Sequence, residues 1–396
     1  MNDLDDFRQQ TRYWLDENCP AEMRTPATQN DYFFGGKKAS YRSDSQGHWF
    51  NLMLDRGWLA PSWPEAYGGG GLSQPQADVL NQEMESLGSR PPLVGMGLWM
   101  IGPVLLELGN DVQKNQHLPG IARGEIFWCQ GFSEPGAGSD LASLACKADV
   151  DGDHLVINGS KIWSSMADQA DWMFCLVRTH SGESKHHGIT FVLVDLATKG
   201  ITVEPIRLIN GSAEFCETFF DDVRVPIANV VGEINEGWAV AKRMLFFERL
   251  AMGNIEKSFS SPKPNPSSLA RHYLPFDNGK IANAELRTRI TRNHMRSKAV
   301  ELTMQRVQEA FVAGLPEASQ VMSILKYVTT EEEKRKLALT LDIMGQQGLG
   351  WEGEQFEGIE RQALRDWLLG YGLTIAGGTS EIQLNIIAKR TLALPQ

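Results

Sequence analysis

The sequence predicts a mixed α+β protein with three consecutive domains: a helical domain, a central antiparallel β domain and a second helical domain. Apolar residues recur at helical spacing before Phe127 and again after Gly232. Between Lys147 and Val223 they alternate with polar residues, which is the pattern of strands. A chain of 396 residues is too long for one small core. We therefore expect domains over residues 1–126, 127–233 and 234–396.

Composition and charge restrict the class of protein. Apolar residues make up 42% and charged residues 22%, as in ordinary globular proteins. The net charge of −11 argues against a nucleic-acid partner. The longest apolar stretch, residues 91–106, is interrupted by Pro and Gly and is shorter than the ~20 residues of a spanning helix. The acidic N-terminus has no secretory signal, so we expect a cytoplasmic protein with no membrane partner.

The five cysteines indicate free thiols. Their number is odd and no Cys-x-x-Cys occurs, so neither a disulfide framework nor a metal site is expected.

Local signals predict the elements of the first domain. An amphipathic helix begins near Phe7 and ends at Cys19-Pro20, and a Gly- and Pro-rich loop covers residues 60–71. Further helices are expected over residues 48–57, 75–86 and 94–108, with Pro75 in a first turn.

The middle domain is predicted to be built from short strands. Asp151-Gly152-Asp153 separates two of them as a hairpin turn would. Other strands are expected over residues 154–159, 173–177 and 189–194. After Gly232 helices return, interrupted at residues 257–283 by a Ser-, Pro- and Asn-rich segment that we interpret as a long loop.

Two segments place glycines beside small hydroxyl residues, Phe132–Asp140 and Gly377–Ile382. Such backbone lets bare N–H groups approach a phosphate-bearing cofactor. Together with Trp58–Gly71 and Asn158–Trp163, and in this order, they resemble the acyl-CoA dehydrogenase family of flavoenzymes. The resemblance covers nearly the whole chain and implies that family's fold, with a C-terminal four-helix bundle.

The resemblance implies that FAD is the cofactor, which needs a hold on its pyrophosphate, polar contacts at the ring edge and a flat wall. Taken singly, Ser133 is equally a turn residue, Trp163 a core residue and Thr379 a helix cap. The residues that match the family's flavin contacts are Gln130, Phe132, Ser133, Gly138, Ser139, Trp163, Ser165, Thr379 and Glu381.

The family removes the α-proton of an acyl thioester with a carboxylate while the flavin accepts the β-hydride. In many members that carboxylate stands where this chain has Gly377, which cannot accept a proton. A minority carries the base in a Glu-Arg-Leu sequence on an earlier helix, matched here by Glu248-Arg249-Leu250. Met244, Leu245, Ala251 and Met252 put Glu248 in an apolar stripe, where desolvation raises the pKa of a carboxyl group. The alternative is a buried structural Glu paired with Lys or Arg.

The resemblance also implies the rest of the site. The backbone N–H of Gly377 would stabilise the thioester oxyanion, and Arg249 and Trp99 would contact the acyl-CoA substrate. Gly95, Gly97 and Gly102 suggest room for a bulky, branched or ring-bearing acyl group. Electrons from the reaction, which yields the trans-2-enoyl-CoA, would pass to electron-transfer flavoprotein.

Two departures from the family fall on the part that serves a neighbouring subunit's flavin. The usual Arg-x-x-Phe-Gly segment is replaced by residues 267–276, and Gly-Gly-Asn-Gly becomes Gly345–Gly348 with Asp342 in place of Gln. Gln346 would obstruct a diphosphate and Asp342 would repel it. The chain is therefore either a homo-oligomer or part of a heterotetramer with a related subunit. The sequence is also compatible with an oxygen-using acyl-CoA oxidase or with a non-catalytic partner subunit.

Overall fold

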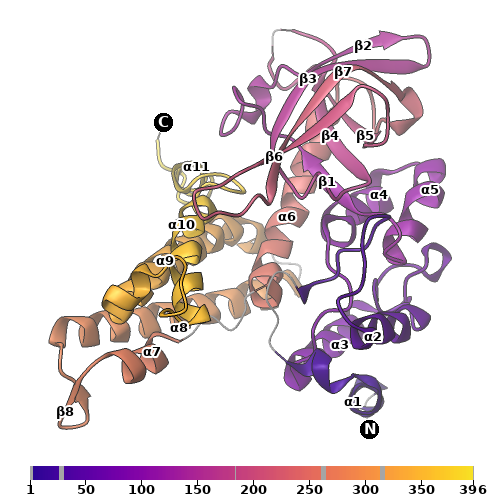
Figure 1. Cartoon of the computed structure of the whole chain (residues 1–396). Helices are drawn as coiled ribbons and strands as arrows, with labels where there is room; N and C mark the ends of the chain where they lie inside the picture. The colour runs from indigo at the N-terminus through magenta and orange to yellow at the C-terminus, as the bar shows by residue number, and fades with distance from the viewer. Residues whose placement is uncertain (1–2, 26–30, 183, 260–264, 313–316, 396) are drawn as a thin grey trace. The chain divides into compact units, whose positions relative to one another are not determined.

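The computed structural model describes residues 3–25, 31–182, 184–259, 265–312 and 317–395. The chain forms two compact units, Met1–Ile206 with Ala213–Pro262 and Arg207–Ser212 with Lys263–Gln396. The first unit holds helices α1–α5, the large sheet and helix α6, and the second holds the later helices (Figure 1). The predicted α+β arrangement of helices, strands and helices is confirmed.

Capping residues explain where the N-terminal helices begin. Ser43 accepts the backbone N–H of Gln46 before α2, and Pro75 lies in the first turn of α3, as predicted. Asn110 and Gln113 form a capping box at the start of α5, a helix that was not predicted and that has Pro119 inside it. The bounds are α1 Asp3–Asn18, α2 Asp44–Asp55, α3 Gln74–Leu87, α4 Gly102–Leu108 and α5 Asp111–Ala122.

The helix expected over residues 94–108 is shorter than predicted. A π-helical turn spans Gly97–Ile101 and leads into α4, whereas residues 94 and 95 are not helical. Gly95 has a φ of +157°, outside the helical range.

Seven strands form one sheet in the order β1-β4-β2-β3-β7-β6, with β5 paired to β4. The predicted hairpin is confirmed, because Asp151 pairs with His154 across the turn between β2 and β3. The sheet is not purely antiparallel: β1 and β2 both pair with β4 in parallel. The bounds are β1 Trp128–Gly131, β2 Lys147–Asp151, β3 His154–Ser165, β4 Trp172–Arg178, β5 Ile189–Asp195, β6 Ile201–Ile206 and β7 Phe215–Pro226.

A shared apolar core joins the sheet to the helices of the first unit. It contains residues of α4 and α5, of β1, β4 and β5, and of α6, which spans Gly237–Phe259. Strand β1 and helix α6 are thereby held against the same core.

The interpretation of residues 257–283 as a long loop is wrong for most of the described residues in that range. Helix α6 continues to Phe259, Asn265 caps α7 at Pro266–Tyr273, and Phe276–Asp277 (β8) pairs with Lys280–Ile281 (β9). Asn278 and Gly279 have the positive φ that a tight hairpin turn needs. The remaining helices are α8 Ala284–Val312, α9 Glu317–Met344, α10 Gly358–Leu373 and α11 Ser380–Ile386. Within the described ranges, no helix is both long and apolar enough to cross a bilayer.

Candidate active site

The loop after β1 holds several of the predicted flavin contacts. Gln130 lies on β1, and the ring of Phe132 is buried edge-on against Phe174 and Phe191. Phe132 can therefore offer a ligand its backbone but not its ring. Ser133 is half-buried, and its carbonyl oxygen accepts the N–H of Ile162 at 2.9 Å, which joins the loop to β3.

The outer side of this loop is open. Gly136, Gly138 and Ser139 are exposed. A methyl group added to either glycine would meet no protein atom within 4 Å. The backbone at these positions is therefore accessible to a ligand.

Trp163 is turned outward by a β-bulge. The pairing of β3 with β7 shifts between Lys161 and Ser164, and Trp163 in between has a φ of +63°. This left-handed conformation costs a bulky residue about 1 kcal/mol or more. Regular alternation would turn Trp163 to the same side as the buried Lys161; with the bulge, the side chain of Trp163 is 54% exposed. Ser165 ends β3 close by and is half-buried.

These features fit a flavin. Open glycine backbone, the Ser133 side chain and the exposed Trp163 ring lie on two segments joined by the Ser133–Ile162 hydrogen bond. They correspond to the pyrophosphate hold, the polar contact and the flat wall that FAD requires.

Helix α6 brings Glu248 to strand β1. Nε2 of Gln130 lies 3.5 Å from Oε2 of Glu248, at the outer limit of a hydrogen bond. Met244, one turn earlier, is fully buried, and Leu245 and Phe247 pack against the shared core. The apolar stripe is thus observed on the N-terminal side of Glu248, which is itself half-buried. The side chains of Arg249 and of residues 250–259 lie outside the described part of the structure.

In the second unit, a two-glycine turn precedes α11. Gly377 and Gly378 have φ of +66° and +94°. Thr379 caps the helix, since its hydroxyl oxygen accepts the N–H of Ile382 at 3.2 Å, so the predicted capping role is confirmed. Hydrogen bonds from its own backbone N–H and from Thr379 lower the pKa of the exposed Glu381, which is therefore an anion at neutral pH.

Two buried side chains hold this turn in place. The hydroxyl of Ser380 donates to Oε1 of Glu331 on α9 at 2.8 Å. Nε2 of Gln383 donates to the carbonyl oxygen of Gly377 at 3.0 Å. Gly378 is favoured by its φ of +94°, and a Cβ there would lie 2.7 Å from the same amide nitrogen, so the Gln383 side chain would have to shift.

The expectation that glycines leave room for substrate is wrong at Gly97 and Gly102. A Cβ at Gly102 would lie 2.1 Å from the Trp63 ring, and one at Gly97 would lie 3.0 Å from Ile121. These glycines allow close packing of neighbouring side chains. Trp99 is half-buried and packs against the same apolar residues.

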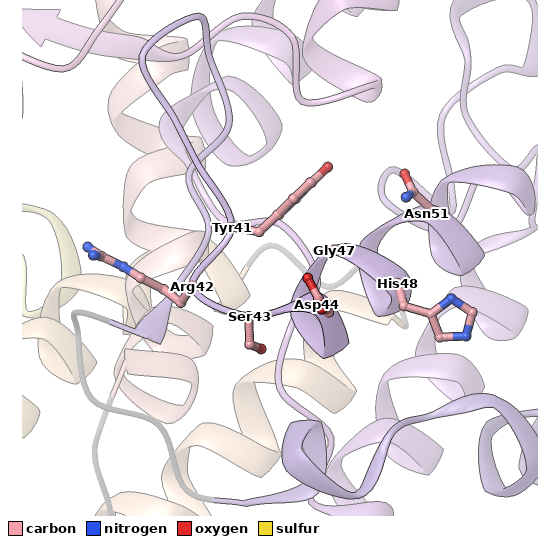
Figure 2. Close-up of a pocket in the computed structure, with 7 residues that line it drawn as sticks. All are labelled: Tyr41, Arg42, Ser43, Asp44, Gly47, His48 and Asn51. Carbon is pink, nitrogen blue, oxygen red and sulfur yellow. The ribbon is translucent and has the colours of Figure 1, made fainter.

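A surface hollow of about 540 Å³ lies at the beginning of α2 and involves none of the predicted site residues (Figure 2). Its lining residues are Tyr41, Arg42, Ser43, Asp44, Gly47, His48 and Asn51.

Sequence reasoning assigned no role to Glu134 and Lys161. The Lys161 side chain is fully buried, and Nζ lies 2.6 Å from Oε1 of Glu134. Glu134 lies in the loop of residues 132–140 that holds predicted flavin contacts, which we call the flavin loop. The available signal was strand alternation: Leu155 and Ile157 point inward on β3, and a lysine at a later inward position requires a buried acidic partner.

Three family models match the chain in order. They are the N-terminal domain of acyl-CoA dehydrogenase over residues 3–125, the middle domain over 129–223 and the C-terminal domain over 235–392. The chain belongs to the acyl-CoA dehydrogenase family. It is therefore an oxidoreductase of a family whose members are FAD-dependent flavoproteins of lipid catabolism, as the resemblance predicted.

Individual acyl-CoA dehydrogenases are similar over their full length. The chain is 34% identical to acyl-CoA dehydrogenase IpdE1 of Mycobacterium tuberculosis, over 100% of this chain and 99% of the relative. Among solved structures, the "Tcur3481-Tcur3483 steroid ACAD" is 29% identical with a TM-score of 0.78, covering 99% of this chain and 98% of that one. The ChsE4-ChsE5 complex from Mycobacterium tuberculosis is 26% identical with a TM-score of 0.73, covering 100% and 98%.

Proposed function

We propose that this acyl-CoA dehydrogenase oxidises an acyl-CoA thioester to the trans-2-enoyl-CoA, with Glu248 as the base. The observation that carries the proposal is the approach of Glu248 to Gln130, because Gln130 lies on the strand that leads into the flavin loop. FAD supplies the hydride acceptor when it is bound. Glu248 takes the α-proton, and the Gln130 amide orients its carboxylate.

The turn before α11 in the second unit supports this assignment, because it carries no carboxylate that could act as the base. Gly377 has no side chain, so this turn provides only backbone donors at the position where many family members carry the carboxylate. In the proposed reaction the N–H of Gly377 donates to the thioester oxygen as negative charge develops there. Thr379 and Glu381 contact the flavin, and Arg249 and Trp99 contact the substrate.

Anaerobic reduction tests the base. Wild type and Glu248→Gln are mixed with a panel of acyl-CoA thioesters, and the absorbance band of oxidised flavin near ~450 nm is followed. Loss of a general base is expected to slow bleaching by about 100-fold or more without loss of bound FAD. Glu204→Gln, at an exposed position on β6, is the control and should bleach like wild type. If Glu248→Gln bleaches at the wild-type rate, the base is a different group.

The names of similar proteins support a ring-bearing substrate. One similar structure is named a steroid acyl-CoA dehydrogenase. The panel should therefore include steroid-derived and straight-chain thioesters at equal concentration. Faster bleaching with straight chains would contradict the steroid assignment and leave the base assignment intact.

A second candidate is that the chain works as one subunit of a heterotetramer. Two similar structures are named with pairs of different proteins, Tcur3481-Tcur3483 and ChsE4-ChsE5. Residues 267–276, where the family's Arg-x-x-Phe-Gly is missing, include most of α7. Asp342 forms an ion pair with Arg289, which partly offsets its repulsion of a diphosphate, whereas Gln346 is exposed. Native mass and FAD content of the chain expressed alone test this candidate. A homotetramer with one FAD per subunit would exclude it.

The electron acceptor is proposed to be electron-transfer flavoprotein. Turnover of the reduced enzyme with that protein, compared with hydrogen peroxide formation in air, separates a dehydrogenase from an acyl-CoA oxidase. Rapid peroxide formation at the full turnover rate would favour the oxidase.

A further inference from the structure

Lys161 and Glu134 form a buried ion pair in the interior of the β domain. Lys161 is 0% exposed and the Glu134 side chain is 8% exposed. Nζ of Lys161 lies 2.6 Å from Oε1 of Glu134. Removing two such charges from water costs several kcal/mol per ion, and apolar replacements of buried pairs are often no less stable. Stabilisation of the fold therefore does not by itself explain why a buried ion pair is present here.

The pair holds three separate segments of backbone together. Besides Lys161, the Glu134 carboxylate accepts the backbone N–H groups of Ala145 at 2.6 Å and Cys146 at 2.9 Å. Lys161 also donates to the carbonyl oxygen of Phe132 at 3.2 Å. The flavin loop, strand β3 and the segment before β2 are thus joined at one point.

Backbone contacts extend this lock along the loop. Glu134 and Ala137 exchange two hydrogen bonds of 3.0 Å and close a tight turn. The Ser133 carbonyl accepts the N–H of Ile162, the residue between Lys161 and the outward-turned Trp163. Gly136 and Gly138, on the other side of the turn, contact no protein atom at the Cβ position. The charged pair therefore fixes the inner side of a loop whose outer side is open.

We propose that Lys161 and Glu134 are positioning residues for the flavin. Their ion pair sets the conformation of residues 132–138 relative to Trp163, so that the backbone and hydroxyl donors of the loop face the flavin before it binds. Pre-organisation of this kind increases affinity because less conformational entropy is lost on binding. This inference rests on the proposed flavin site and concerns FAD affinity, not the acyl-CoA reaction.

The test is titration of flavin-free protein with FAD. The enzyme is purified in its native oligomeric state, and its FAD is then removed. The variants are Glu134→Gln, Lys161→Met and the double variant, which leaves no unpaired buried charge. Asp151→Asn/Arg224→Gln removes an exposed ion pair between β2 and β7 and is the matched control. Urea unfolding of each flavin-free protein is measured in parallel, as is the absorption spectrum of bound FAD, which reports the surroundings of the ring.

The double variant keeps one acceptor oxygen for the N–H groups of Ala145 and Cys146, so it is expected to unfold at a lower urea concentration than wild type. It should remain folded without urea but bind FAD at least about tenfold more weakly. Its bound FAD should show a shifted spectrum, and the control should match wild type in all three measurements. FAD affinity of the double variant within twofold of wild type would overturn the inference. The inference would also be overturned if, in all three variants, the decrease in bound FAD equalled the decrease in the fraction of folded protein. Neither result depends on bleaching by acyl-CoA, so failure of the proposed base is distinguished from failure of this inference.

Discussion

His117 is expected to make the first unit sensitive to mild acid. It lies on α5, is 1% exposed, and its ring packs edge-on against Trp172 and Trp128, with centroids 4.7 and 5.2 Å away. Neither ring nitrogen has a hydrogen-bond partner among the described residues. Burial lowers the pKa of His117 from 6.5 to about 4.

The direction of the effect follows from proton binding. The unfolded chain takes up the proton at a higher pH than the folded chain, so acid favours unfolding. The stabilisation from neutral His117 is complete above about pH 6.5 and is lost as the pH falls through 4. Between pH 7 and pH 5 this group removes about 2 kcal/mol from the free energy of unfolding.

The assay is urea unfolding between pH 5 and pH 7.5 at constant ionic strength, followed by tryptophan fluorescence. Nine of the eleven tryptophans lie in the first unit, the others being Trp351 and Trp367, so the signal mainly reports that unit. His117→Phe keeps an aromatic ring between Trp128 and Trp172 but cannot be protonated. His48→Phe, at an exposed position on α2, is the control.

Wild type and His48→Phe are expected to lose about 2 kcal/mol more than His117→Phe over this pH range. Parallel pH profiles for wild type and His117→Phe would refute the reasoning, since they would mean that the ring is solvated or hydrogen-bonded in the folded protein. Because Trp128 begins β1, the same acid range should also release FAD from wild type before it does so from His117→Phe.

Three further predictions concern other sites. Trp163→Asn should change the free energy of unfolding of flavin-free protein by less than about 1 kcal/mol, because Asn tolerates the left-handed conformation. The same variant should bind FAD more weakly. FAD binding as strong as that of wild type in a titration would contradict the role of the indole as a wall for the flavin ring. The cysteines are all buried, and burial raises the pKa of Cys146 to about 11. Native protein should therefore react with a thiol reagent at pH 8 at least about 100-fold more slowly than protein in denaturant. Gln383→Leu should accelerate amide hydrogen exchange at residues 377–379 and destabilise the second unit by about 1–2 kcal/mol; unchanged exchange would show that the turn needs no side-chain support.

The sequence by itself determined the features that depend on neighbouring residues, namely helix caps, turns and helix starts. Caps such as Thr379, the Asp151–Asp153 hairpin and the Pro75 helix start depend on residues within a few positions of one another, and each is found where predicted. The family could also be recognised from sequence, because its motifs are contiguous segments that occur in a set order.

Contacts between distant residues were decided only by the tertiary structure. Period-two alternation would have buried Trp163, and it is the bulge against β7 that exposes it. Glycines that suggest empty space in the sequence are filled by Trp63 and Ile121, which approach from elsewhere in the chain. Lys161 and Glu134 are 27 positions apart, and each alone would be an ordinary charged residue. Burial gives them a role, because a charge removed from water must find its partner within the fold.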